Sequence, residues 1–166
     1  YIPMMYYETW EDIMLVEKVC KKLLSSKIDY AIVGGYAVAL HGAVRGTMDL
    51  DLVIKQNLKS YVAVETALVD LGFEARLPVS GSDVFNFREE YIKNKNLIAW
   101  SFYNLKDPSE IVDIVITHDL NKLKKKKISV NKLDIFILSK SDLITMKKAS
   151  GRPQDLADID ALERLK

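Results

Sequence analysis

Two aspartates stand inside a short run of apolar residues, Asp-Leu-Asp-Leu-Val-Ile at positions 49–54. Such a run is typical of a β-strand, in which side chains two residues apart point to the same face of the sheet. Asp49 and Asp51 would therefore lie side by side among apolar neighbours, where repulsion and the loss of water penalise both charges. A divalent cation removes this conflict, and Mg²⁺ binds carboxylate oxygens together with water and phosphate. The segment predicts a metal site on a strand; a pair facing water at a strand edge is the alternative.

A third aspartate, Asp113, lies within the apolar run Ile-Val-Asp-Ile-Val-Ile at positions 111–116. A lone carboxylate in such a strand is costly unless a cation compensates it. If this strand lies beside the strand of Asp49, three carboxylates converge, as in sites where two metal ions clamp the attacking and leaving oxygens of phosphoryl transfer. A buried ion pair between Asp113 and a lysine or arginine is the alternative.

Four of the seven glycines fall between residues 34 and 46. Gly34 and Gly35 follow an apolar strand expected at 30–33 and precede a short alanine-rich helix expected at 36–40. Glycine allows the backbone to approach phosphate closely, and a helix N-terminus offers free N–H groups to an anion. We therefore expect a phosphate cradle at this turn, although a simple tight turn would use the same residues.

Arg45 and Thr47 come just before the two aspartates. The planar fork of an arginine suits phosphate, so a phosphate contact by Arg45 is one expectation and a surface charge is the other. Thr47 either bonds to phosphate or caps the backbone.

These motifs together resemble the polymerase-beta-like nucleotidyltransferase superfamily. The resemblance rests on Gly-Gly-Tyr-Ala at 34–37, His-Gly at 41–42, Arg-Gly-Thr-Met-Asp-Leu-Asp at 45–51 and the later Asp113. This string is similar to that of the AbiEii-type and related small bacterial and archaeal nucleotidyltransferases. The segments 142–147 and 151–158 are similar to the helical motif that follows the catalytic domain in those proteins. The resemblance covers about residues 28–162.

The resemblance implies an enzyme that transfers a nucleoside monophosphate from a nucleoside triphosphate such as ATP to an acceptor hydroxyl and releases pyrophosphate. It implies Mg²⁺ or Mn²⁺ held by Asp49, Asp51 and Asp113. Asp113 would hold the catalytic metal near the attacking hydroxyl, whose deprotonation it could assist. The residues expected to bind nucleotide or phosphate are Gly34, Gly35, Arg45, Thr47 and Lys147. Those expected to form an ion-pair network that fixes the last helix are Arg152, Asp155 and Asp158.

Hydrophobic periodicity predicts an α+β fold with a mixed sheet, flanking helices and a C-terminal helical pair. The resemblance implies that this sheet is nucleotidyltransferase-like. Helices are expected at 9–27, 36–40, 58–71, 139–151 and 153–165. Strands are expected at 30–33, 49–54, 73–76, 97–103, 111–117, and, as a hairpin, at 128–130 and 133–138. We expect residues 1–138 to form the core with its N-terminal helix, and residues 139–166 to extend the same domain.

Composition excludes several classes of protein. A formal net charge of +1 argues against a strongly basic nucleic-acid coat protein and an acidic disordered tail. The single cysteine, Cys20, excludes an internal disulfide framework and a cysteine-based zinc finger. No apolar run approaches the ~20 residues that span a membrane, and the first ten residues lack the pattern of a signal peptide. We expect a cytoplasmic protein with no membrane association.

The acceptor and the partners stay open at this point. A small molecule, a tRNA end or a protein could supply the hydroxyl. Six lysines, Lys122, Lys124 to Lys127 and Lys132, occur without an acidic residue between Asp119 and Asp134. We expect a solvated hairpin or loop there, with an electrostatic contact to an RNA acceptor as the alternative. Because residues 139–166 leave little room for an acceptor-binding domain, the second hypothesis is a non-catalytic module of a toxin–antitoxin-type system that binds nucleotide or a protein partner.

Overall fold

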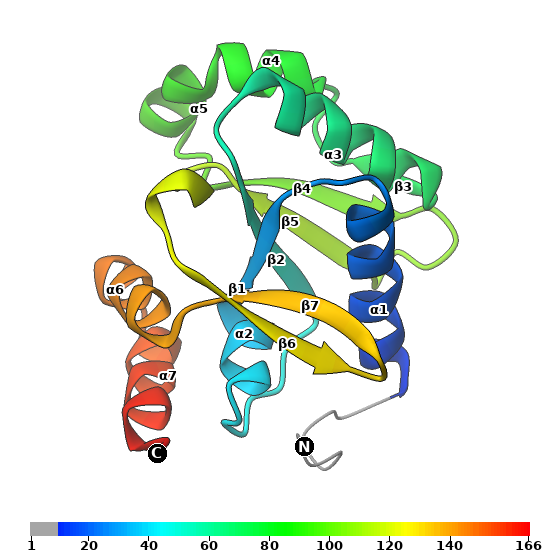
Figure 1. The fold of residues 1–166 in the computed structure, drawn as a ribbon. Helices are drawn as coiled ribbons and strands as arrows, with labels where there is room; N and C mark the ends of the chain where they lie inside the picture. The colour runs from blue at the N-terminus through cyan, green and yellow to red at the C-terminus, as the bar shows by residue number, and fades with distance from the viewer. Residues whose placement is uncertain (1–9) are drawn as a thin grey trace.

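The computed structural model describes the backbone of residues 10–166 and the side chains of residues 14–166. Within that part of the chain, seven strands form one sheet. They are β1 (Tyr30–Val33), β2 (Asp49–Ile54), β3 (Phe73–Ala75), β4 (Ala99–Asn104), β5 (Ile111–Val115), β6 (Lys125–Val130) and β7 (Leu133–Leu138). Their order across the sheet is β3-β4-β5-β2-β1-β7-β6 (Figure 1). The expected mixed α+β architecture is confirmed.

The centre of the sheet brings together the two strands that carry the aspartates. Strand β2 lies antiparallel to β1 on one side and parallel to β5 on the other. The neighbours of the aspartates in sequence, such as Leu50 and Val112, are completely buried in the core. This alternation of buried and partly exposed residues leaves the aspartates on the opposite face of the sheet.

Helices cover both faces of the sheet. They are α1 (Trp10–Ser25), α2 (Gly34–Leu40), α3 (Leu58–Asp70), α4 (Gly81–Asn86), α5 (Arg88–Lys95), α6 (Lys140–Ser150) and α7 (Pro153–Arg164), with the short 3-10 helix η2 (Leu120–Lys122). Helices α1 and α3 lie together on one side, whereas α2, α6 and α7 lie together on the other (Figure 1). The C-terminal helical pair is therefore present and packs beside α2. None of the described helices is both long and apolar enough to cross a lipid bilayer.

Three local expectations need correction or completion. The helix start expected at Thr9 lies outside the described residues. No helix is expected between residues 76 and 97, but Ser80 and Asp83 form a capping box that begins α4 at Gly81. Helix α5 was not predicted at all, since none of its residues is buried and it carries no amphipathic signal.

Three of the six lysines of the lysine run lie in an edge strand. Strand β6 begins at Lys125, three residues before the expected start, because its backbone pairs with β7 over its whole length. The hairpin itself is confirmed, with its turn at Asn131 and Lys132, which both have positive φ angles. Lysines on an exposed edge strand oppose edge-to-edge association, which is a common reason for their presence there.

Candidate functional site

The carboxylates of Asp51 and Asp113 lie directly opposite each other on neighbouring strands. In the parallel pairing of β2 with β5, Asp51 is opposite Asp113 and Asp49 is opposite Ile111. The convergence of the three carboxylates requires that these two strands are neighbours, and this expectation is confirmed. On its other side Asp51 is opposite Val33, the last residue before helix α2.

The pKa values of this group show uncompensated negative charge. Burial, followed by the charges of Asp113 and Asp49, raises the pKa of Asp51 to about 7. Burial also raises the pKa of Asp113, against a smaller opposing effect from the Ser101 hydroxyl. The Oδ1 atom of Asp113 is buried and has no hydrogen-bond partner among the described residues. A buried acceptor without a partner is rare in folded proteins and calls for a ligand or an ion.

Helix α2 begins directly against these carboxylates, two residues earlier than expected. Gly34, its first residue, has φ of +64°, and a Cβ there would lie 2.0 Å from Oδ2 of Asp51. A Cβ on Gly35 would lie 2.7 Å from Oγ1 and Cβ of Thr47. Only glycine fits at either position, so the pair brings the helix N-terminus close to the acidic cluster.

A cleft of about 720 Å³ opens over the carboxylates. Every residue that was expected to hold metal, nucleotide or phosphate lines this cleft, together with Arg152 and Asp155. Asp158 is buried and is not among the lining residues. The cleft gathers residues from the start of α2, the loop before β2, strands β2, β4 and β5, and helices α6 and α7. Its size is within the range of about 300–1,000 Å³ typical of small-molecule and cofactor sites.

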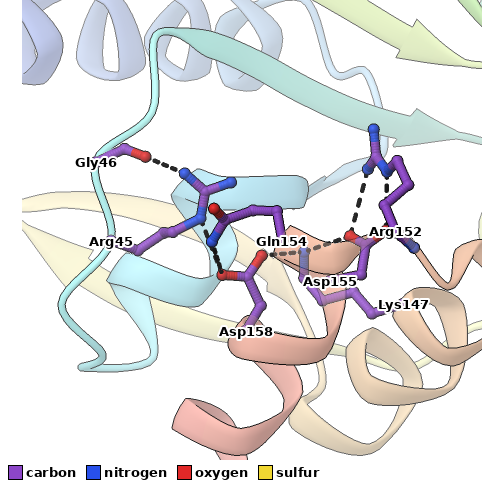
Figure 2. A network of polar contacts seen from close by, with 7 residues as sticks. All are labelled: Arg45, Gly46, Lys147, Arg152, Gln154, Asp155 and Asp158. Atoms are coloured by element: carbon purple, nitrogen blue, oxygen red, sulfur yellow. Dashed lines mark hydrogen bonds and ion pairs between the residues drawn. The ribbon is translucent and has the colours of Figure 1, made fainter.

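One wall of the cleft is a network of ion pairs that joins the C-terminal helices to the loop before β2 (Figure 2). Lys147 of α6 is buried, and its Nζ lies 2.7 Å from Oδ2 of Asp158 and 3.4 Å from Oδ1 of Asp155. Arg45 donates its Nε–H to Oδ1 of Asp158 at 2.9 Å, and Gln154 donates to the same oxygen at 3.1 Å. The network expected from Asp155 and Asp158 is present, and it extends to both Arg45 and Lys147.

Arg152 and Asp155 form the second half of this wall. The Arg152 side chain donates from Nε to Oδ2 and from Nη2 to Oδ1 of Asp155, at 2.8 and 3.3 Å. Burial alone would raise the pKa of Asp155, but hydrogen bonds from Arg152 and Ser150 outweigh it and lower the pKa to about 2. The Asp155 carboxylate therefore stays ionised at any physiological pH.

The opposite wall was not predicted from the sequence and is without Lys or Arg among its described lining residues. It consists of Asn96, Leu97, Ile98, Ala99, Ser101, Val115, Thr117 and His118. Burial, and then the charge of Arg88, lowers the pKa of His118, so this histidine is neutral at pH 7. These residues show no motif in the sequence, and Ala99 and Ser101 reach the site because β4 pairs with β5.

No ready-made metal centre of three or more His, Cys, Asp or Glu side chains is found within the described residues. Mg²⁺ does not require one, because it is commonly held by one or two carboxylates together with water and substrate phosphates. The acidic cluster therefore has the donor type that this cation prefers.

Residues 11–165 match the family described as nucleotidyltransferase of unknown function (DUF6036). The chain belongs to this family. Among solved structures it is similar to an antigenic nucleotidyltransferase-like protein from Paracoccidioides brasiliensis, with 22% identity, a TM-score of 0.60 and coverage of 93% of this chain and 76% of that one.

Two further solved structures share the fold at lower identity. A protein from Thermotoga maritima that is described as a putative nucleotidyltransferase is 14% identical, with a TM-score of 0.63 and coverage of 95% of this chain and 96% of that one. The lincosamide antibiotic adenylyltransferase LnuA, bound to lincomycin, is 12% identical, with a TM-score of 0.62 and coverage of 95% and 98%. A search among curated proteins finds no match.

Proposed function

We propose that this protein is a Mg²⁺-dependent enzyme that transfers a nucleoside monophosphate from a nucleoside triphosphate to an acceptor hydroxyl and releases pyrophosphate. The observation that carries the proposal is the pairing of Asp51 with Asp113 on adjacent strands, beside Asp49, in the floor of the cleft. Membership of a nucleotidyltransferase family and a shared fold with an adenylyltransferase support it. We also propose that the protein is related to the AbiEii-type nucleotidyltransferases, which residues 34–51 resemble.

The acidic cluster fits a divalent cation on two counts. The pKa of Asp51 is raised to about 7 by burial and by the neighbouring carboxylates, so a cation would relieve a real electrostatic cost. The partnerless Oδ1 of Asp113 offers a buried oxygen ligand. We assign Asp49, Asp51 and Asp113 as the ligands of Mg²⁺ or Mn²⁺, which when bound would neutralise phosphate charge and orient the reacting oxygens.

The side chains have distinct tasks in this chemistry. Asp113 lies on the side of the cluster next to the uncharged wall, opposite Ser101. Its carboxylate is therefore placed to hold a cation near an acceptor hydroxyl and to assist the loss of the hydroxyl proton. The hydroxyl oxygen then forms a bond to the α-phosphorus, while the bond from that phosphorus to the bridging oxygen breaks and pyrophosphate leaves. Most of the catalytic effect in such a reaction comes from positioning and charge neutralisation.

Phosphate binding is assigned first to the turn at Gly34 and Gly35 and to the Thr47 hydroxyl beside it. The missing Cβ atoms let backbone N–H groups approach an anion next to the carboxylates. Arg45 and Lys147 add positive charge to this wall, although each shares its charge with Asp158. Their contribution to phosphate binding would be through the electrostatic field more than through direct hydrogen bonds.

We further propose that the acceptor is a small hydroxyl-bearing molecule. The described lining of the uncharged wall offers none of the lysine or arginine side chains that an RNA backbone would need. LnuA, which shares the fold, is a lincosamide antibiotic adenylyltransferase.

The test is label transfer from each of the four α-³²P-labelled nucleoside triphosphates in Mg²⁺, with small hydroxylated compounds, bulk tRNA or the protein itself as acceptor. We expect label transfer and pyrophosphate release that are abolished in EDTA and in Asp51→Asn. The matched control is Asp134→Asn, which alters a strand aspartate on β7 away from the cleft. Activity of Asp51→Asn equal to that of wild type would overturn the proposal. Mg²⁺-dependent binding without turnover for any acceptor would favour the binding-module hypothesis.

A further inference from the structure

Three cationic side chains contact the carboxylates of Asp155 and Asp158, but their side chains differ in exposure. The exposed fractions are 6% for Lys147, 23% for Arg45 and 69% for Arg152. Lys147 lies between both carboxylates, so its single ammonium group is already neutralised. It has little left to offer a ligand in the cleft.

Arg45 is also committed to the protein. Its Nε–H binds Asp158, and its Nη1 donates to the backbone oxygen of Gly46. These bonds fix the loop before β2 against α7 (Figure 2). The guanidinium of Arg45 therefore acts mainly as a structural link.

Arg152 differs from Lys147 and Arg45 because Asp155 binds only one edge of its guanidinium group, and the other edge is open to the cleft. The Asp155 carboxylate accepts hydrogen bonds from Nε and Nη2 of Arg152. This bidentate arrangement fixes the plane of the guanidinium group. The Nη1 group has no hydrogen-bond partner among the described residues, and the side chain lines the cleft. Figure 2 shows the guanidinium pointing away from Asp158 and Lys147. An arginine whose guanidinium plane is fixed on one edge and exposed on the other is preorganised to bind an anion.

The open edge of Arg152 belongs to the same cleft as the acidic cluster. Arg152 lines this cleft together with Asp49, Asp51 and Asp113. A polyphosphate bound between Arg152 and the acidic cluster would direct some phosphate oxygens to the guanidinium group. Other phosphate oxygens would face a metal ion at the carboxylates. This is the charge arrangement that a metal-bound polyphosphate requires.

We propose that Arg152 binds the polyphosphate of the incoming nucleoside triphosphate, with Asp155 as the residue that positions its guanidinium. This role rests on the nucleotidyltransferase function proposed above. It gives Arg152 a direct binding task in addition to capping helix α7 and to its place in the ion-pair network with Asp155, the role that the sequence suggested.

The experiment measures the Kd of α,β-methylene analogues of the four nucleoside triphosphates in Mg²⁺ by calorimetric titration. Loss of one charge-assisted contact in Arg152→Gln should weaken binding about 10- to 100-fold. Arg152→Lys should give an intermediate Kd, because lysine keeps the charge and loses the fork. Binding of the corresponding nucleoside, which has no phosphate, should be the same in wild type and Arg152→Gln.

The matched control is Arg164→Gln, which alters an exposed arginine of the same helix that pairs with Asp160. It should leave the Kd unchanged. A lower Tm with an unchanged Kd in Arg152→Gln would show a purely structural role and overturn the inference; if that variant does not fold, an unchanged Kd in Arg152→Lys would overturn it. Failure of the wild type to bind any of the analogues would instead overturn the proposed function itself.

Discussion

At the scale of single residues, Asp51 couples protonation to the stability of the metal-free protein. Its pKa is raised from 3.8 to about 7, first by burial and then by Asp113 and Asp49. The folded chain therefore holds this proton more tightly than the unfolded chain. The resulting stabilisation is complete below about pH 4 and is lost as the pH rises through about 7. We expect the free energy of unfolding in EDTA, measured with urea, to fall between pH 5 and pH 8.

Variants of the same cluster separate this effect from general acid sensitivity. Asp51→Asn removes the titrating group and should flatten the profile, whereas Asp134→Asn should leave it as steep as in wild type. Asp113→Asn removes a like charge that faces Asp51 and should raise the Tm in EDTA at pH 8. A clear fall in Tm for Asp113→Asn would mean that its carboxylate serves a structural ion pair.

The sequence could predict these carboxylates because each one breaks an apolar strand pattern, which makes it costly without a compensating cation. It could not predict the partner of Arg45. Asp158 follows 113 residues later, and the two meet only when α7 packs beside α2. The open edge of Arg152 was equally invisible, because the exposure of a side chain depends on what packs around it.

At the scale of elements, a buried ion pair fastens α6 to α7 and to the loop before β2. Asp158→Ala would leave Lys147 buried with only its 3.4 Å contact to Asp155. Removal of one partner from a buried pair costs about 3–5 kcal/mol, so a large loss of stability is expected in urea denaturation. Lys147→Met should also destabilise, and the double variant should show a coupling energy of about 1–3 kcal/mol.

The control for this buried ion pair is Lys148→Met, which alters the next lysine along helix α6. Lys148 is exposed and lies 3.8 Å from Glu163. Its replacement should change the free energy of unfolding by less than about 0.5 kcal/mol. Strictly additive effects of Asp158→Ala and Lys147→Met would contradict a direct interaction between the two helices at this point.

The hairpin turn between β6 and β7 offers a stabilising substitution. Asn131 and Lys132 have φ angles of 49° and 67°, as the two central residues of a type I′ turn require. Lysine is strained in this left-handed conformation, so Lys132→Gly should stabilise the protein by about 0.5–1 kcal/mol, seen as a Tm higher by about 1–4 °C. Lys127→Gly, within the regular part of β6, should instead destabilise by about 0.5–1 kcal/mol. A lower Tm for Lys132→Gly would contradict this interpretation of the turn.

Helices and strands could be predicted from the sequence where burial imposes a regular spacing of apolar residues. Strands β1, β2 and β7 have the bounds that their apolar residues indicate, because each lies between two other strands and contributes apolar side chains to the core. Helix α5 lies on the surface with no buried face, so no period of hydrophobicity marks it. Strand β6 extends through Lys125 because backbone pairing with β7 outweighs the low strand propensity of lysine.

At the scale of the whole molecule, the cleft separates a charged wall from an uncharged one around a floor of carboxylates. The charged wall depends on the C-terminal helices, since Lys147, Arg152 and Asp155 all come from α6, α7 or the junction between them. A nucleotide bound there with its metal would therefore contact both the sheet and the helical pair. Its binding should stabilise the entire fold and not only a local segment.

Thermal denaturation with each of the four nucleoside triphosphates, in Mg²⁺, Mn²⁺ or EDTA, measures this linkage. A ligand at ~100-fold excess over its Kd stabilises the native state by about 2.7 kcal/mol, which corresponds to a rise in Tm of about 5–10 °C for a chain of this size. We expect this rise only with a divalent cation, and we expect Asp51→Asn to abolish it while Asp134→Asn retains it. An equal rise in EDTA would place the nucleotide away from the carboxylates. An equal rise in Asp51→Asn would show that the cluster does not hold the metal, because a site built on Asp51 cannot keep its affinity without that charge.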